Sequence, residues 1–313
     1  MKTTYILALA IGAVLCAGLF ARKIRRCGVK PMTALIALPL SAVLGVVLAR
    51  VSYFLLEYRD ITVRYDGLGG LLSTKPEEFC FLGGCAGVVL AILLTAKIAG
   101  QKGSTLLDAF APCGALMVAI ARASEGLLDP LAMIGMGGVV ENEALQFFPL
   151  AVKVEAYGMV LNVAYAVFML EAVLALLCAA ASFVISHRGS FAPGRVFLHT
   201  AFFLALPQIF TEQILGKYMA WGFVRIEQLL CALIVFAITL YPCIRSRKLT
   251  GYLPALGCLL CAAVLIWMEF TLDNKLLFGI DIPTMGCYAI MIAALGCMAG
   301  LSLLAYRRLN KAE

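Results

Sequence analysis

The sequence predicts an all-α integral membrane protein with about nine transmembrane helices. Of its 313 residues, 63% are hydrophobic and 14% are charged, whereas a soluble domain carries about 25% charged residues. Apolar runs of about 20 residues, the length that crosses a bilayer as a helix, recur along the whole chain. These runs are continuous and do not alternate every second residue, which argues against a transmembrane barrel of strands.

The apolar runs define the expected spans. The basic residues around the first run mostly follow it, with only Lys2 before it, so we interpret it as a retained span and not as a signal peptide. The nine predicted spans are 4–21, 32–56, 79–97, 104–121, 157–186, 196–215, 223–243, 252–270 and 284–305.

Basic residues predict how the spans are oriented. Fifteen of the 25 Lys and Arg residues lie in the short segments "RKIRRCGVK", "KIAGQK", "HRGSFAPGR", "RSRK" and "YRRLNK". Short cationic loops stay in the cytoplasm, and all five segments fall on one side when the N-terminus is outside and the C-terminus is inside. Membrane insertion and the anionic inner leaflet account for the net charge of +7. A nucleic-acid partner is therefore not expected.

Polar side chains inside apolar runs are candidate functional residues, because a charge in the bilayer is costly. They are Arg50, Arg122, Glu171, His199, Gln208, Glu212, Glu227 and Glu269. With only two histidines in the chain, a histidine-rich metal centre is excluded. We predict neither a metal site nor a cofactor.

Arg122 ends its apolar run on the predicted outer side, three residues before Glu125. The two side chains share a face if the helix continues that far. A guanidinium presents a planar fork of donors that suits phosphate or carboxylate, so Arg122 could contact a phospholipid head group. The alternative is that Arg122 pairs with Glu125 and holds the loop that follows.

Gln208 and Glu212 are spaced i, i+4 in "FFLALPQIFTEQIL" and therefore share one helical face. Pro207 loosens this helix and favours a local opening. The alternative is an interhelical hydrogen bond that serves packing only.

Four stretches carry a resemblance to the prolipoprotein diacylglyceryl transferases. "YILALAIGAVLCAGLFARKIRRCGV" resembles the first span of that family with its arginine-rich exit. "SAVLGVVLARVSYFLL" is similar to a G-A-R-x-x-Y stretch, and "FCFLGGCAGVVLAILLTAKIAG" resembles the H-G-G-L-I-G segment. "LLDAFAPCGALMVAIARASEG" resembles L-D-x-x-A-P together with the arginine of the G-R signature. The matching positions are Arg50, Tyr53, Gly83, Gly84, Gly87, Asp108, Ala111, Pro112 and Arg122.

The sequence also departs from the family's pattern. Leu82 stands in place of the motif histidine, and Glu125 takes the first asparagine position of G-R-x-x-N-x-x-N-G-E. In the sixth span, the pattern Y-x-x-x-R-x-x-x-E appears as Leu204, Gln208 and Glu212. One tyrosine and one arginine of the pattern are thus replaced.

The resemblance implies a fold and an activity. Residues 1–245 would form the transferase-like core of seven helices, and 246–313 an additional two-helix hairpin. The activity would move a diacylglyceryl group from phosphatidylglycerol to the cysteine thiol of a prolipoprotein, at the bacterial cytoplasmic (inner) membrane. The partners would be the phospholipid and the signal peptide of the prolipoprotein.

The residues expected to carry this activity fall into two sets. The catalytic set is Arg122, Glu125, Glu212 and Gln208; the lipid-binding set is Arg50, Tyr53, Gly83, Gly84 and Arg122. Two alternatives stay open. One is a catalytically inactive protein of this fold that binds or moves a lipid or lipid-linked ligand, and the other is a membrane transport subunit.

Overall fold

The computed structural model forms two compact units. The first comprises Met1–Thr200 with Leu215–Met219, and the second comprises Ala201–Ile214 with Ala220–Glu313. The structure describes residues 3–30, 32–58, 61, 63, 65, 71, 75–156, 159–187, 192–216, 219–221, 224–246, 249–272 and 282–310.

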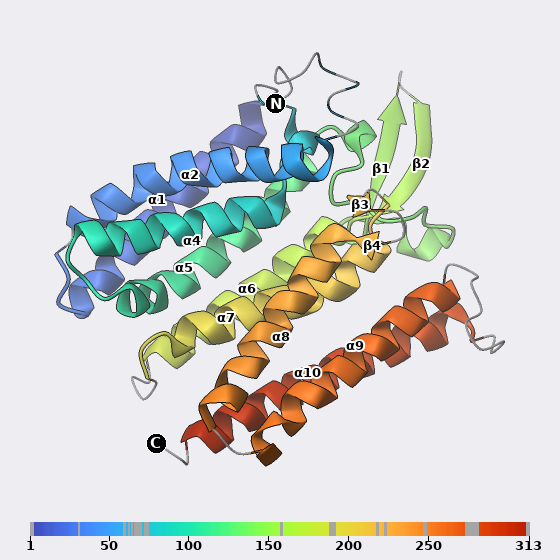
Figure 1. Cartoon of the computed structure of the whole chain (residues 1–313). Coiled ribbons are helices and arrows are strands. Elements are labelled where there is room, and N and C mark those ends of the chain that lie inside the picture. Colours follow the sequence, from blue (N-terminus) through green and yellow to red (C-terminus); the bar gives the residue numbers. More distant parts are fainter. Residues whose placement is uncertain are drawn as a thin grey trace. The chain divides into compact units, whose positions relative to one another are not determined.

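Long helices dominate the described part of the chain (Figure 1). Eight of them are long and apolar enough to cross a membrane. The ninth, α7, carries the polar residues His199, Gln208, Glu212 and Gln213. The prediction of an all-α membrane protein is confirmed by these helices: α1 (Thr3–Arg26), α2 (Met32–Leu56), α4 (Phe81–Ile98), α5 (Gly103–Ser124), α6 (Val167–His187), α7 (Arg195–Ile214), α8 (Ile226–Ser246), α9 (Leu253–Leu272) and α10 (Thr284–Asn310).

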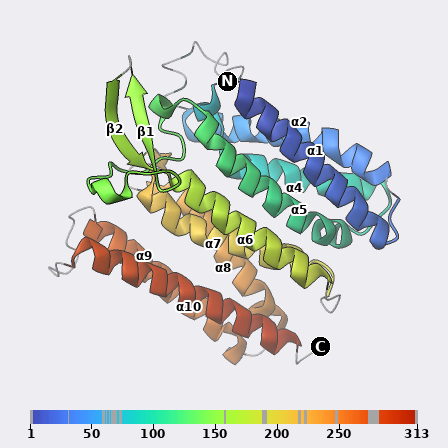
Figure 2. The same cartoon turned by 180° about the vertical axis from the view of Figure 1, so that it is seen from behind.

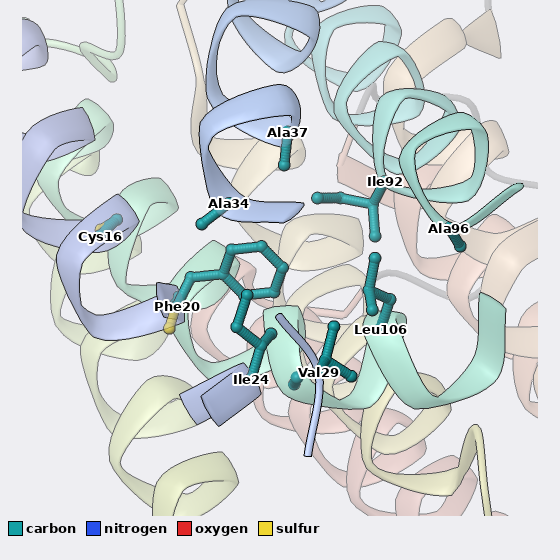
Figure 3. Packing of buried hydrophobic residues seen from close by; sticks show 11 residues of the cluster. Cys16, Phe20, Ile24, Val29, Ala34, Ala37, Ile92, Ala96 and Leu106 are labelled. Carbon is teal, nitrogen blue, oxygen red and sulfur yellow. The ribbon is translucent and has the colours of Figure 1, made fainter. Parts of the chain in front are cut away.

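In the first unit, α1, α2, α4 and α5 run side by side, and α6 packs against α5 (Figures 1 and 2). Small and branched side chains fill the space where the first four helices meet (Figure 3). Phe20 of α1 packs edge-on against Phe110 of α5, with ring centroids 5.9 Å apart. This core fixes α5, which carries Arg122, against its neighbours.

Glycines allow α2 and α4 to pack closely. A Cβ atom at Gly83 would lie 2.8 Å from the carbonyl oxygen of Leu48, and one at Gly87 would overlap the carbonyl of Leu44. Small residues at membrane helix interfaces let backbones approach in this way. At these positions, matched to the family above, packing alone explains the need for glycine.

The predicted fifth span, 157–186, begins too early and is corrected by the structure. Strand β2 (Met159–Tyr165) pairs antiparallel with β1 (Ala151–Ala156), and α6 begins at Val167. The Val-rich sequence of β2 suits a strand, and Val154 of β1 lies opposite Asn162. Because β2 is apolar and runs directly into α6, the two elements read as one continuous apolar run.

In the second unit, α9 and α10 pack side by side (Figure 2), and both contact α8. Cys243, Ala255 and Ala305 form a small buried cluster there. The hydroxyl of Tyr306 donates a hydrogen bond to the carbonyl of Ile238 at 3.2 Å. A short hairpin, β3 (Ala220–Trp221) with β4 (Val224–Arg225), precedes α8. The division into 1–245 and 246–313 stays a prediction.

Candidate functional site

Arg122 is enclosed by two carboxylates and an aromatic ring. It lies near the end of α5 and is 7% exposed. Its Nη1 atom donates a hydrogen bond to Oε1 of Glu125 at 2.9 Å, and its Nε atom lies 2.9 Å from Oε2 of Glu171. The ring of Phe81 covers the guanidinium, with 4.1 Å between Cζ and the ring centroid. Three elements of the first unit thus converge on one cation.

The local backbone explains why Glu125 reaches Arg122. Helix α5 ends at Ser124, and a 3₁₀ turn, η3 (Glu125–Leu127), continues from it. The backbone N–H of Glu125 donates to the carbonyl of Arg122, so the chain keeps turning in the helical sense. The prediction that these two side chains share a face is confirmed by their ion pair.

Gly135 shapes the other side of the Glu125 carboxylate. Its φ of +65° is one that L side chains rarely adopt. A Cβ atom there would overlap Oε2 of Glu125 and lie 2.8 Å from Cβ of Phe168. The N–H of Phe168 donates to the carbonyl of Gly135 at 2.8 Å. The loop after η4 (Pro130–Ala132) therefore closes directly over this carboxylate.

Arg50 forms a second buried ion pair. Its Nη2 atom lies 3.1 Å from Oε2 of Glu78, in η2 (Pro76–Glu78), and its Nη1 atom donates to the main-chain oxygen of the same residue. The hydroxyl of Tyr65 donates to Oε1 of Glu78 at 2.8 Å. The Tyr53 ring centroid lies 5.6 Å from Cζ of Arg50. The structure therefore brings Arg50 and Tyr53 together and joins Arg50 to the segment before α4.

Asp108 fixes the beginning of α7. Its Oδ2 atom accepts a hydrogen bond from the N–H of Gly194 at 2.6 Å, and its Oδ1 atom accepts one from Phe197 at 2.8 Å. Unpaired N–H groups at a helix N-terminus need such acceptors. The aspartate matched to L-D-x-x-A-P thus caps a neighbouring helix.

The sixth-span residues lie in the second unit. Nε2 of Gln208 donates to Oε1 of Glu212 at 2.9 Å, and both side chains are buried. Arg225 donates to the main-chain oxygen of Glu212, and its Nε atom lies 3.6 Å from Oε1 of Glu269 on α9. Gln228 donates to the carbonyl of Ile209 at 3.1 Å. Side chains from α7, β4, α8 and α9 therefore form one polar cluster.

Sequence reasoning identified some of these partners and missed others. Glu171 stood out as a charge inside an apolar run, but its partner lies on another helix, 49 positions back along the printed sequence. Glu78 and Gly135 were not identified. The only signal for Glu78 is its place in the acidic "PEE" segment before a span. The described residues show no group of three or more His, Cys, Asp or Glu side chains placed to hold a metal ion.

The family model of the prolipoprotein diacylglyceryl transferases matches residues 3–244. The chain belongs to this family. The resemblance seen in the sequence is thereby confirmed, and the match runs from α1 to the end of α8, with α9 and α10 beyond it. Members of the family act on phospholipid and lipoprotein substrates. A comparison with curated proteins gave no match.

Proposed function

We propose that the chain is a phosphatidylglycerol-dependent prolipoprotein diacylglyceryl transferase of the bacterial cytoplasmic (inner) membrane. Its N-terminus lies outside and its C-terminus inside. The observation that supports this function is the setting of Arg122, which stands at the signature arginine position and is buried against Glu125, Glu171 and Phe81. A preorganised cation of this kind stabilises charge that develops on a departing phosphate.

The reaction requires one bond to form and one to break. The thiolate of the prolipoprotein cysteine attacks the diacylglycerol carbon that is bonded to the phosphate oxygen, and the bond between that carbon and that oxygen breaks. Glycerol phosphate leaves, and the thiol proton passes to a base. Glu125 and Glu212 are the two candidate bases, and Gln208 orients Glu212 through the hydrogen bond between their side chains. The guanidinium of Arg122 stabilises the negative charge on the departing phosphate.

The ion pair between Arg50 and Glu78 contributes to lipid binding in this proposal. Arg50 and Tyr53 would form the second part of the head-group site, with the guanidinium kept in place by Glu78. Gly83 and Gly84 would set the spacing of α2 and α4 beneath it. The prolipoprotein signal peptide would approach from the membrane.

One specific observation favours an inactive lipid-binding protein of the same family instead. Leu82 replaces the motif histidine and Gln208 replaces the motif arginine. Two polar groups of the family pattern are therefore absent from the positions matched in this sequence.

A transfer assay separates the two functions. The full chain is placed in vesicles of phosphatidylglycerol with a fluorescent peptide that carries a lipoprotein signal and its cysteine. Thioether product identified by mass spectrometry supports the transferase. Binding of labelled phosphatidylglycerol without product, and without rescue of a strain depleted of its transferase, supports the lipid-binding alternative.

A further inference from the structure

Carboxylates already occupy two edges of the Arg122 guanidinium. A guanidinium offers its donors along an edge that includes Nε and along the edge of its two terminal nitrogens. Glu171 lies against Nε and Glu125 against Nη1, each at 2.9 Å. Phe81 covers a face. A phosphate that binds the edge of Arg122 that includes Nε therefore competes with Glu171 for that position.

The two carboxylates are not held in the same way. Glu125 follows Arg122 in the same helical turn, and its Oε2 atom is confined by Gly135. This pair belongs to one continuous segment closed over by its own loop. Glu171 comes from α6, a separate helix, and reaches Arg122 by its side chain alone. Of the two, Glu171 can give up its place without unwinding the segment around Arg122.

The charges around Arg122 also matter. Arg122 always carries a proton, so with both glutamates ionised these three buried side chains have one negative charge in excess. Tyr5 of α1 also interacts electrostatically with Arg122 and Glu125. An anionic phosphate would add another negative charge to a buried site, where like charges repel strongly.

We propose that Glu171 is an internal competitor of the lipid phosphate. Its carboxylate occupies the anion position on Arg122 and leaves that position when the head group binds. This rests on the proposed function, because it assigns the phosphate of the donor lipid to Arg122. Glu171 leaves by turning its side chain away from the guanidinium, so its competition lowers the affinity for an anionic phospholipid.

Glu171→Gln tests this role, because it keeps the shape of the side chain and removes its charge. The probe is phosphatidylglycerol in nanodiscs or mixed micelles, and the quantity measured is its affinity for the full-length protein. We expect the variant to bind about tenfold more tightly than the wild type at about pH 8.

Glu155→Gln is the matched control. Glu155 is exposed on β1, so its replacement removes the same formal charge and should leave the affinity for phosphatidylglycerol unchanged. Unchanged or weaker binding in Glu171→Gln overturns the inference.

The binding and transfer assays distinguish failure of the proposed function from failure of the competitor role. Tighter binding in Glu171→Gln without any thioether product in the transfer assay would support the competitor role and exclude transferase activity. Product formation with an affinity for phosphatidylglycerol unaffected by Glu171→Gln would support the transferase and exclude the competitor role.

Discussion

The Nε atom of Arg122 and the Oε2 atom of Glu171 lie 2.9 Å apart and join α5 to α6 by a buried ion pair. Both side chains are less than 10% exposed. Pairing of this kind is a poor guide to net stability, because desolvation of both ions offsets their attraction. Its consequence is geometric, since the guanidinium is fixed by residues on either side before any ligand arrives.

Replacing Arg122 tests whether the transfer reaction needs the planar set of guanidinium donors or only the positive charge. Arg122→Ala leaves two buried carboxylates without their cation and should lower the free energy of unfolding by about 3–5 kcal/mol. Arg122→Lys keeps the charge, but one ammonium group cannot reproduce the planar fork. We expect both variants to lose transfer in the vesicle assay, with the lysine variant the more stable in thermal unfolding. Full activity and unchanged lipid binding in both would make Arg122 a purely structural partner of the glutamates.

Gly135→Ala tests how the Glu125 carboxylate is confined. A left-handed backbone costs an L residue roughly 1–2 kcal/mol, and the new Cβ would overlap Oε2 of Glu125. We expect a lower melting temperature, because the backbone is strained and Glu125 must shift away from its ion pair with Arg122. Gly138→Ala is the control, since a Cβ there meets nothing within 4 Å. Equal behaviour of the two variants would show that the loop does not position Glu125.

The sequence allowed the helices to be predicted because each is a continuous apolar run, and Arg122 with Glu125 because three-residue spacing is a local property. The partnership with Glu171 depends on which helices are neighbours, and no local pattern encodes that. The same holds for Arg50 and Glu78. Hairpin β1–β2 was missed because its second strand is apolar and leads directly into α6. Sequence therefore singled out polar residues in the spans, such as Arg122 and Glu171, and packing determined their partners.

Asp108 variants should report on the start of α7 in two steps. Asp108→Ala removes both acceptors from the N–H groups of Gly194 and Phe197 and should cost about 1 kcal/mol. Asp108→Asn keeps one oxygen acceptor and should cost less. Hydrogen exchange measured by mass spectrometry should rise in the first turn of α7, and the rise should be larger in Asp108→Ala than in Asp108→Asn. Exchange that rises equally across α5 and α7 would indicate global destabilisation instead of a lost cap.

The orientation of the chain predicts which cysteines an impermeant reagent reaches. Cys27 is exposed and follows α1 in the basic segment "RKIRRCGVK", which the distribution of Lys and Arg assigns to the cytoplasm. Glu143 is exposed in η5 (Glu143–Leu145), between α5 and α6, and is assigned to the outside. An impermeant maleimide added to intact cells should label the Glu143→Cys variant at the new thiol and leave Cys27 unlabelled until the membrane is opened.

A Cys27→Ser background makes that comparison specific. In that background, the signal gained on opening the membrane should fall, while labelling at position 143 should persist. The physical reason is that two of the nine predicted spans lie between each basic segment and the next. An even number of crossings returns the chain to the same side, so all five segments share one side. Labelling of Cys27 in intact cells, with position 143 protected, would place Arg122 at the cytoplasmic face. The proposed reaction would then have no access to prolipoprotein substrates exposed outside, and the transferase assignment would have to be abandoned.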